Sequence, residues 1–443
     1  MIISLFLFLI IIACYIVKPE FLMPLWLITT PILAPILVLY AGIADADTTQ
    51  EVIWSLWTIF NRAFLIIVLY EVLIRKARIC LKFVTILLPL LVLCIYIIMH
   101  GLVFNFDLGS IYHNLTQVLY VLTLLIVFLL NKKTWPKLSH LLITCCIILI
   151  IQLVWIPLNF EGIFAYISRY ELYATNSEEA ILMPGSFFKS NMLSDFVSFV
   201  YLFISIDYFK RGKMPAYQFY TITLIVVFLL VLSGSRMPVV MFVLTLLACA
   251  ILFKKKKVIF IVGIVGLLFV GLTPFISSAT NNDISENEGL NRISKGLTSF
   301  YESKKHKGDD NSTVSLSTSL IDKYFMRSPL IGNGLSPKGD NAYTAYGFNL
   351  NDFLADARLA YTLVEFGVLG LLLFLFYYYK VIRLSCSLAG DKSPISMYII
   401  FSFLLLFSIT EVGIFYIPNY YYVFAYCFGL KRENDTLRHL MNK

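Results

Sequence analysis

Residues 251–270 read ILFKKKKVIFIVGIVGLLFV, in which one apolar run ends, four lysines follow and a second apolar run begins. The two runs extend over 237–253 and 258–277, and each is long enough to cross a hydrocarbon core of roughly 30 Å as a helix. Lysine ammonium groups do not lie within that core without a large cost in free energy. The stretch therefore predicts two membrane-spanning helices joined by a short basic connection.

The same pattern of apolar runs and short polar connections covers nearly the whole chain. Of its 443 residues, 59% are hydrophobic and 14% are charged, and the mean hydropathy is +0.82, which excludes a soluble protein. The sequence predicts an all-α polytopic membrane protein with about 12 to 14 transmembrane helices. The predicted spans are 2–17, 21–43, 52–74, 83–104, 113–130, 138–160, 192–208, 215–233, 237–253, 258–277, 355–379, 394–412 and 416–430. The first run lacks a preceding basic region or cleavage site, so we expect a retained span.

Basic residues predict the orientation of the spans. The net charge of +8 comes from Lys and Arg gathered in every second connection, whereas connections 44–51 and 105–112 contain neither residue. Because cytoplasmic connections carry the excess of Lys and Arg, the pattern predicts a cytoplasmic C-terminus and gives no reason to expect a nucleic-acid partner. The basic residues are Arg75, Lys76, Arg78 and Lys82; Lys132, Lys133 and Lys137; Lys210, Arg211 and Lys213; Lys254–Lys257; Lys380, Arg383 and Lys392; and Lys431, Arg432 and Arg438.

The connections on the other side are uneven in length and divide the chain into three parts. Residues 1–277 form an N-terminal bundle of about ten spans with an outer loop at 161–191. Residues 278–354 form a long outer loop, expected to fold as amphipathic helices and to end at Pro329 and the turn Gly332-Asn333-Gly334. Residues 355–443 form the C-terminal spans and a cytoplasmic tail. No internal repeat of the kind that builds many transporters is found.

The eight cysteines and five histidines show no spacing typical of a metal site or a disulfide framework. We therefore expect neither a metal nor another cofactor. The histidines are scattered at positions 100, 113, 140, 306 and 439.

Three short motifs lie near the predicted outer ends of spans. The first is Ser233-Gly234-Ser235-Arg236, where Arg236 either binds a lipid-linked anion through paired hydrogen bonds or extends to water as an interfacial anchor. The second is Ser328-Pro329-Leu330-Ile331-Gly332-Asn333-Gly334-Leu335. The third starts at Asp356-Ala357 and contains Gly367 and Gly370.

The order and spacing of these motifs resemble the family of O-antigen polymerases and O-antigen ligases. In that family a Ser-Gly-Ser-Arg turn precedes a large periplasmic loop, which ends in an amphipathic segment and a Pro, Gly-x-Gly turn. The next span opens with His-Asn, followed after nine residues by Gly-x-x-Gly. Here Gly367 and Gly370 keep that spacing, while Asp356 and Ala357 stand in place of His-Asn. The resemblance covers roughly residues 185–380 and includes the stretch 185–191.

The resemblance implies a GT-C-like glycosyltransferase of the bacterial inner membrane, with 278–354 as a helical periplasmic loop. A polymerase would join oligosaccharide repeat units carried on undecaprenyl pyrophosphate, and a ligase would transfer the glycan to lipid A-core. Because the His-Asn pair is more regular in ligases, Asp356-Ala357 favours a polymerase. Membrane lipid, a chain-length regulator and a flippase are the further partners implied. A lipid-linked oligosaccharide flippase or transporter is the alternative from another class, since it would also be apolar and carry buried charges.

The reaction needs cations for the leaving pyrophosphate and a carboxylate for the acceptor proton. Because cationic side chains can stabilise the leaving pyrophosphate, we expect this step to proceed without a metal ion. The candidate pyrophosphate ligands are Arg236, Arg358, Arg292 and Arg327. The candidate catalytic carboxylates are Asp356, Glu365 and Asp195, with Glu365 about seven residues below Arg358 on the same helical face. For Glu365, a buried pair with a basic group is the structural alternative.

Two further features each allow two interpretations. Arg62 lies about ten residues into its span and is expected to face the protein interior or a watery cavity, either in an ion pair or in contact with the lipid pyrophosphate. The rings of Phe415, Tyr416 and Tyr420–Tyr422 either stack on sugars or belong to an interfacial aromatic belt.

Overall fold

The computed structural model describes residues 2–41, 46–78, 81–104, 108–155, 185–187, 190–232, 325–333, 358–389 and 417–441. Within these ranges the chain forms helices and turns, and no strand. Several helices are long and apolar enough to span a membrane, so the protein is a multi-pass helical membrane protein, as predicted.

The α-helices are α1 (Ile2–Val17), α2 (Leu22–Leu27), α3 (Ala34–Ala41), α4 (Ala46–Leu69), α5 (Leu81–Phe104), α6 (Leu108–Leu130), α7 (Leu138–Trp155), α9 (Ser190–Ile206), α10 (Ala216–Leu232), α16 (Arg358–Ala389) and α18 (Ile417–Met441). Short 3₁₀ or π-helical turns join or extend them: η1 (Pro19–Phe21), η2 (Thr29–Leu33), η3 (Tyr70–Ile74), η4 (Lys132–Thr134), η5 (Gly185–Phe187), η6 (Asp207–Arg211) and η7 (Phe325–Arg327).

Each predicted span within the described residues overlaps one of these helices or, at 21–43, a bent pair of them. Spans 237–253, 258–277 and 394–412 lie outside the described residues, as does most of the predicted loop 278–354. Among the described helices, those that satisfy the length and composition of a full span are Ser55–Ile74, Lys132–Trp155, Met192–Phe209 and Leu363–Leu384. The total number of spans therefore stays a prediction.

The predicted span 21–43 is bent rather than straight. Its halves, Pro19–Leu27 and Thr29–Leu37, meet at 49°. The bend lies beside η2, which contains Pro31, and a proline inside a helix removes a backbone donor and opens the turn before it.

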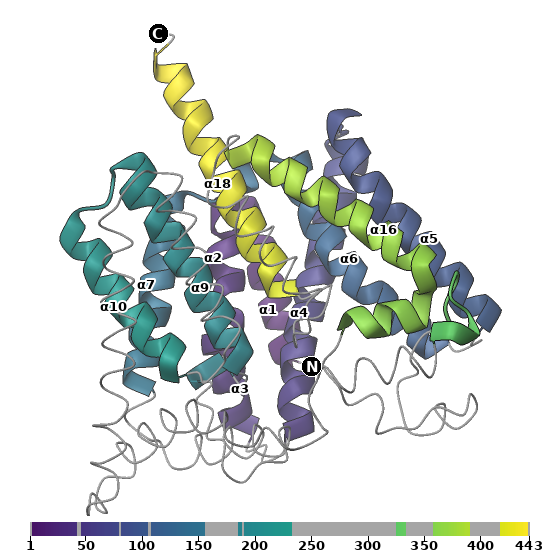
Figure 1. Ribbon diagram of the computed structural model, residues 1–443. Coiled ribbons are helices and arrows are strands. Elements are labelled where there is room, and N and C mark those ends of the chain that lie inside the picture. Colours follow the sequence, from purple (N-terminus) through teal and green to yellow (C-terminus); the bar gives the residue numbers. More distant parts are fainter. Residues whose placement is uncertain are drawn as a thin grey trace, which may run out of the picture.

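Helix α18 lies in the middle of the bundle and packs against α6, α7, α9 and α16 (Figure 1). Every residue from Tyr420 to Leu430 except Gly429 has a buried apolar or aromatic side chain. The ring of Tyr421 lies 4.2 Å from Trp26, and the ring of Tyr422 stacks on Phe199 at 4.9 Å, measured between centroids. The interpretation of Tyr420–Tyr422 as sugar-stacking or belt residues is therefore wrong, because these rings build the core.

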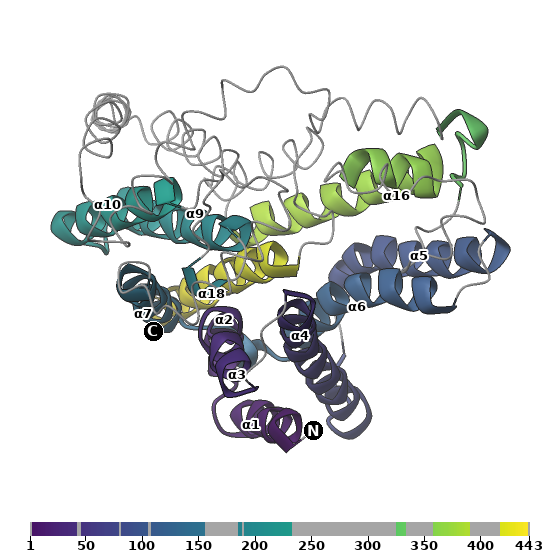
Figure 2. The same cartoon turned by 90° about the horizontal axis from the view of Figure 1, so that it is seen from below.

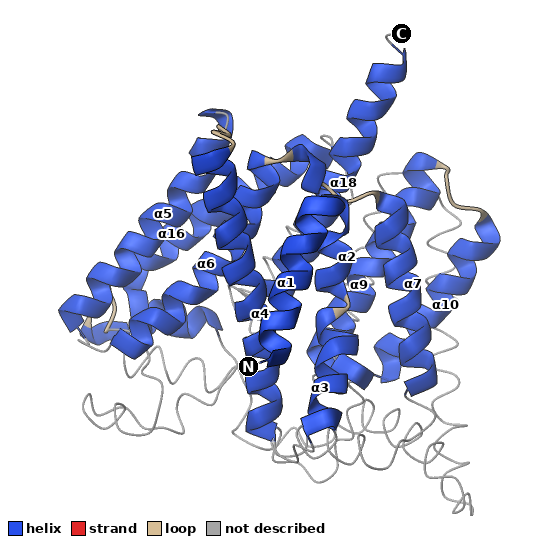
Figure 3. Cartoon of the chain, turned by 180° about the vertical axis from the view of Figure 1, so that it is seen from behind, coloured by secondary structure: helices blue, strands red, loops and turns tan. Residues whose placement is uncertain are grey.

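The same helix begins where the predicted span 416–430 does, within one residue, but ends later. Pro418 does not interrupt it, because it lies in the first turn, where a proline needs no hydrogen-bond acceptor. The helix then continues to Met441 and projects beyond the bundle (Figure 3).

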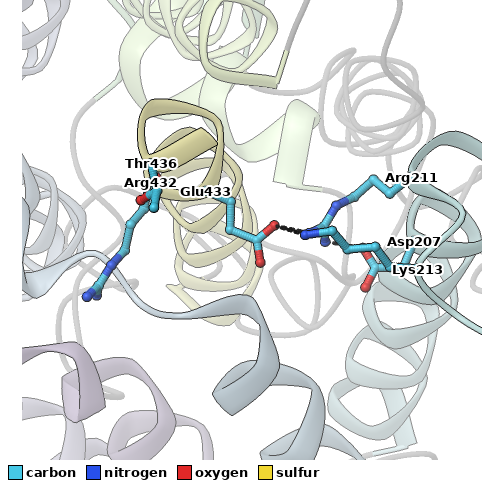
Figure 4. Close-up of polar contacts among 6 residues, drawn as sticks. All are labelled: Asp207, Arg211, Lys213, Arg432, Glu433 and Thr436. Atoms are coloured by element: carbon cyan, nitrogen blue, oxygen red, sulfur yellow. Dashed lines mark hydrogen bonds and ion pairs between the residues drawn. The ribbon is translucent and has the colours of Figure 1, made fainter. Parts of the chain in front are cut away.

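Connections with basic residues gather at the end of the bundle from which α18 projects, and we call this the basic end (Figure 1). Arg211 donates hydrogen bonds to Asp207 and to Glu433 of α18 (Figure 4). Lys213 lies 3.1 Å from the same Glu433 carboxylate, and Lys137 lies 3.0 Å from Glu20. At the basic end, ion pairs therefore hold the connections to one another and to α18.

The opposite end of the bundle holds the first residues of α4, α6, α9 and α16, together with residues 325–333 (Figures 1 and 2). We call this the junction end. Among the described connections, those rich in Lys and Arg thus lie at one end of the bundle.

Candidate functional site

Helix α16 breaks at Gly367. This residue has φ 65° and ψ −167°, so two helical segments meet there (Figure 1). The predicted span 355–379 is therefore broken: residues before Gly367 lie across the junction end, and the span rises from the break (Figure 1). A break of this kind leaves carbonyl groups before it and N–H groups after it without partners in the helix.

The turn Ser328–Asn333 supplies those partners. The backbone N–H of Asn333 donates to the carbonyl of Val364 at 2.8 Å, and its side-chain amide donates to the same oxygen at 3.0 Å. On the other side of the break, the N–H groups of Val368 and Leu369 donate to the carbonyls of Pro329 and Leu330 at 2.9 and 3.0 Å. The turn and the broken helix form one hydrogen-bonded unit, which we call the junction.

Glycines allow the two backbones to approach so closely. A Cβ atom on Gly332, at φ 80°, would overlap the carbonyl of Glu365. A Cβ atom on Gly367 would lie 2.5 Å from the backbone of Gly332 and Leu330. The φ and ψ of Gly367 also fall in a region that is almost restricted to glycine. The Gly-x-Gly turn and the glycine of the later span, noted separately in the sequence, thus contact each other.

Two side chains of the neighbouring helix α5 form hydrogen bonds to backbone carbonyl groups of the junction. The hydroxyl of Tyr96 lies 2.8 Å from the carbonyl oxygen of Phe366 and 3.2 Å from that of Ile331. The Nε2 atom of His100 lies 2.5 Å from the Ile331 oxygen, and because a carbonyl only accepts, Nε2 carries the hydrogen. Sequence reasoning missed both residues. The signal was a polar pair at i and i+4 in an apolar span, which puts them on one helical face.

The junction brings together two of the predicted site residues. Glu365 lies within the break and is 6% exposed. Arg327 ends η7, directly before the turn, and its side chain is exposed. Both residues make further interactions. A buried carboxylate and an exposed guanidinium therefore flank the same backbone unit at the junction end.

Asp195 is not part of this junction. It lies in the second turn of α9, is 9% exposed and belongs to a helix that is buried on all sides from Met192 to Asp207. Nearby, Gln152 of α7 and Ser186 of η5 form two hydrogen bonds to each other. Figures 1 and 2 show α9 on a different side of the bundle from residues 325–333, so the structure separates Asp195 from Glu365.

The remaining predicted site residues are not tested by the structure. Arg236, Arg292 and Asp356 lie outside the described residues, and Arg358 is described only as the first backbone position of α16. Among the described residues, no group of three or more His, Cys, Asp or Glu side chains is placed to hold a metal ion.

A family model described as O-antigen ligase matches residues 221–375. A search of curated proteins gives no match. The matched stretch contains the turn Ser328–Asn333 and the break in α16, so the similarity falls on the segments that form the junction. The match supports glycan transfer of the O-antigen ligase and polymerase type, on a lipid-linked oligosaccharide.

Proposed function

We propose that this chain is an O-antigen polymerase, which joins oligosaccharide repeat units carried on undecaprenyl pyrophosphate at the periplasmic face of the bacterial inner membrane. The family match over 221–375 carries the proposal, because the matched stretch contains the Ser328–Asn333 turn and the break in α16, which form the junction of a multi-pass bundle. A lipid-linked glycan presents its pyrophosphate at a membrane surface, and the proposal puts the junction, at one end of the bundle, on the periplasmic surface.

The chemistry is a displacement at the anomeric carbon. The acceptor hydroxyl oxygen forms a bond to that carbon while the bond to the pyrophosphate oxygen breaks, and a carboxylate takes the acceptor proton. We assign the role of proton acceptor to Asp356, with Glu365 and Asp195 as the other candidates. The pyrophosphate leaves with its electron pair and is stabilised by arginines rather than by a metal ion.

Arg327 is the best-described of the proposed pyrophosphate ligands. Its exposed side chain lies one residue before a turn that is fixed by several hydrogen bonds, so its backbone position is well defined. A guanidinium forms two parallel hydrogen bonds to a phosphate, which a lysine cannot reproduce. Arg236, Arg358 and Arg292 are proposed for the same role.

The burial of Glu365 favours a supporting role over that of first proton acceptor. A carboxylate that is 6% exposed is remote from a hydroxyl arriving from solvent, whereas the main-chain groups on either side of it hold the junction. We therefore rank Asp356, two residues ahead of α16, above Glu365 and Asp195.

Ligase activity is the second candidate, because the matching family is described as O-antigen ligase. Asp356-Ala357 at the position of the ligase-type His-Asn pair favours the polymerase. We further propose that the basic end, including the C-terminus, faces the cytoplasm, and that a flippase and a chain-length regulator work with the protein.

The proposed function is tested with purified protein and a lipid-linked repeat unit. A polymerase gives a ladder of longer glycans on the carrier, and a ligase gives product only when lipid A-core is added. Arg327→Ala should abolish the ladder and Arg327→Lys should restore little of it. Arg383→Ala, at an exposed position nearer the other end of α16, is the matched control and should leave the ladder intact. No product with either acceptor would overturn the proposal.

The proposed topology and domain division have a separate test. Cysteines introduced at Asn282 and Lys305, in the predicted loop 278–354, should react with an impermeant thiol reagent from outside, and a cysteine at Lys255 should not. Labelling at 255 in intact spheroplasts would reverse the assignment of the two ends.

A further inference from the structure

Arg62 points away from the core of the bundle. On α4, the residues Phe60, Phe64 and Ile67 are buried on one face. Arg62 lies on the opposite face with Leu65, Ile66 and Leu69, each of which is close to half exposed. Of the two expected surroundings of Arg62, the protein interior is therefore wrong, because its side chain emerges among exposed apolar residues.

The depth of Arg62 suits a lipid headgroup. The apolar part of its helix begins at Ser55, and Arg62 comes seven residues later, about 10 Å below that point at 1.5 Å per residue. Helical side chains lean toward the N-terminal end of their helix, which for α4 is the junction end (Figure 1). The guanidinium therefore reaches back toward the membrane boundary at the junction end.

The neighbours of Arg62 on α4 and α6 are neutral hydroxyls. The hydroxyl of Thr58, one turn before Arg62 on α4, lies 2.5 Å from that of Tyr120 on α6. Asn61, the adjacent amide, accepts a hydrogen bond from Thr123. Among the described residues, no carboxylate forms an ion pair with Arg62. The local surface thus presents a positive charge beside neutral polar groups.

A guanidinium in this position costs several kcal/mol unless an anion neutralises it. An anion that reaches this surface from the membrane side must itself be part of a lipid. We propose that Arg62 binds the phosphate group of a lipid in the leaflet at the junction end, with its chains along Leu65, Ile66 and Leu69. The phosphate accepts two hydrogen bonds from the guanidinium. This site is independent of glycan transfer.

Two kinds of lipid present this phosphate, a phospholipid and a polyprenyl phosphate carrier. Native mass spectrometry of the full chain in detergent distinguishes them when phosphatidylglycerol or undecaprenyl phosphate is titrated in separately. Arg62→Gln should weaken binding of at least one lipid by about ten-fold or more. A loss confined to one lipid identifies the source, and an equal loss for both identifies a general lipid-phosphate site.

Three controls keep the result specific. Arg62→Lys, which keeps the charge and one donor group, should bind more weakly than wild type but better than Arg62→Gln. Diacylglycerol, which lacks the phosphate, should bind wild type and Arg62→Gln alike. Arg383→Gln, at another exposed arginine, should change neither affinity. Equal binding of both phosphate lipids by wild type and Arg62→Gln would overturn the proposal, whatever the protein does with glycans.

Discussion

The two ends of the bundle are held together by different chemistry. At the junction end, the Ser328–Asn333 turn and the broken helix α16 contact each other through backbone groups. At the basic end, long charged side chains such as Arg211 and Glu433 connect the helices (Figure 4). Backbone contacts depend on shape and admit no larger residue, whereas ion pairs depend on charge and tolerate changes in side-chain length.

This difference agrees with the roles proposed for the two ends, glycan transfer at the junction end and orientation of the helices at the basic end. A site that positions a sugar and a pyrophosphate needs side chains held within a fraction of an ångström, which a rigid backbone unit provides. The basic end needs only to keep the helices together and oriented. The predictions below test whether the junction depends on close approach while the basic end depends on charge.

The largest effect is expected from Gly367→Ala and Gly332→Ala. Each added methyl group meets backbone atoms that cannot move without opening the junction. We expect both variants to lose the folded junction and all glycan transfer, measured by thermal unfolding in detergent and by the glycan ladder.

Gly212→Ala is the control for these variants. Gly212 also has a positive φ, 61°, but no atom lies within 4 Å of an added Cβ. It should lose only the backbone strain, about 1–2 kcal/mol, and keep its activity. If Gly367→Ala were as stable as Gly212→Ala, close approach would not be what holds the junction.

Arg211→Met should have the next largest effect. The Arg211 and Asp207 side chains are 12% and 9% exposed, so removing the cation leaves a buried carboxylate without its partner. The free energy of unfolding should fall by about 3–5 kcal/mol, as seen for broken buried ion pairs. The measurement is unfolding in detergent, with glycan transfer per folded molecule unchanged because the change lies at the basic end.

The double variant Arg211→Met with Asp207→Asn should recover much of this loss, since no uncompensated charge remains. Lys213→Met, whose side chain is 52% exposed, should cost far less. A double variant as unstable as the single one would mean that shape, and not charge, matters at the basic end as well.

Tyr96→Phe should have an intermediate effect. It removes the hydroxyl near the carbonyls of Phe366 and Ile331, and an unsatisfied buried acceptor costs about 1–3 kcal/mol. If Tyr96 positions the junction, kcat should fall while KM for the lipid-linked substrate changes little. Tyr379→Phe, at an exposed tyrosine later in α16, should change neither stability nor kcat.

The outcome for Tyr96 also bears on what sequence reasoning achieves. Apolar run length placed the described spans correctly, because the membrane requires a long helix wherever the chain crosses it. The glycines of the junction were noted as motifs, but their contact joins residues 332 and 367, and no local pattern encodes that approach. The break at Gly367 was missed because a single glycine inside an apolar run does not change its length or hydropathy.

Tyr96 and His100 were missed for a related reason. Their partners are backbone carbonyl groups more than two hundred residues away in sequence. Because every residue has such a group, the residue types do not indicate which one accepts the hydrogen bond. The interior position expected for Arg62 followed from the rule that charged side chains within a span face inward. That rule does not cover an arginine that is close enough to the end of its span for the side chain to reach a headgroup. The candidate carboxylates Glu365 and Asp195 were found by residue type, but only the structure separates them.

The smallest effect is expected from Glu433→Gln. Glu433 is 29% exposed, and its partner Lys213 is 52% exposed, so water and salt screen much of their attraction. Removing the charge should cost about 0.2–1 kcal/mol at low salt, because Arg211 keeps Asp207 as a partner, and the cost should shrink as salt is added. The cost of Tyr96→Phe should not change with salt, because it arises from a neutral hydrogen bond. Unfolding of both variants at low and high salt makes the comparison, and a salt-independent loss in Glu433→Gln would show that the basic end is held by packing of α18 rather than by charge.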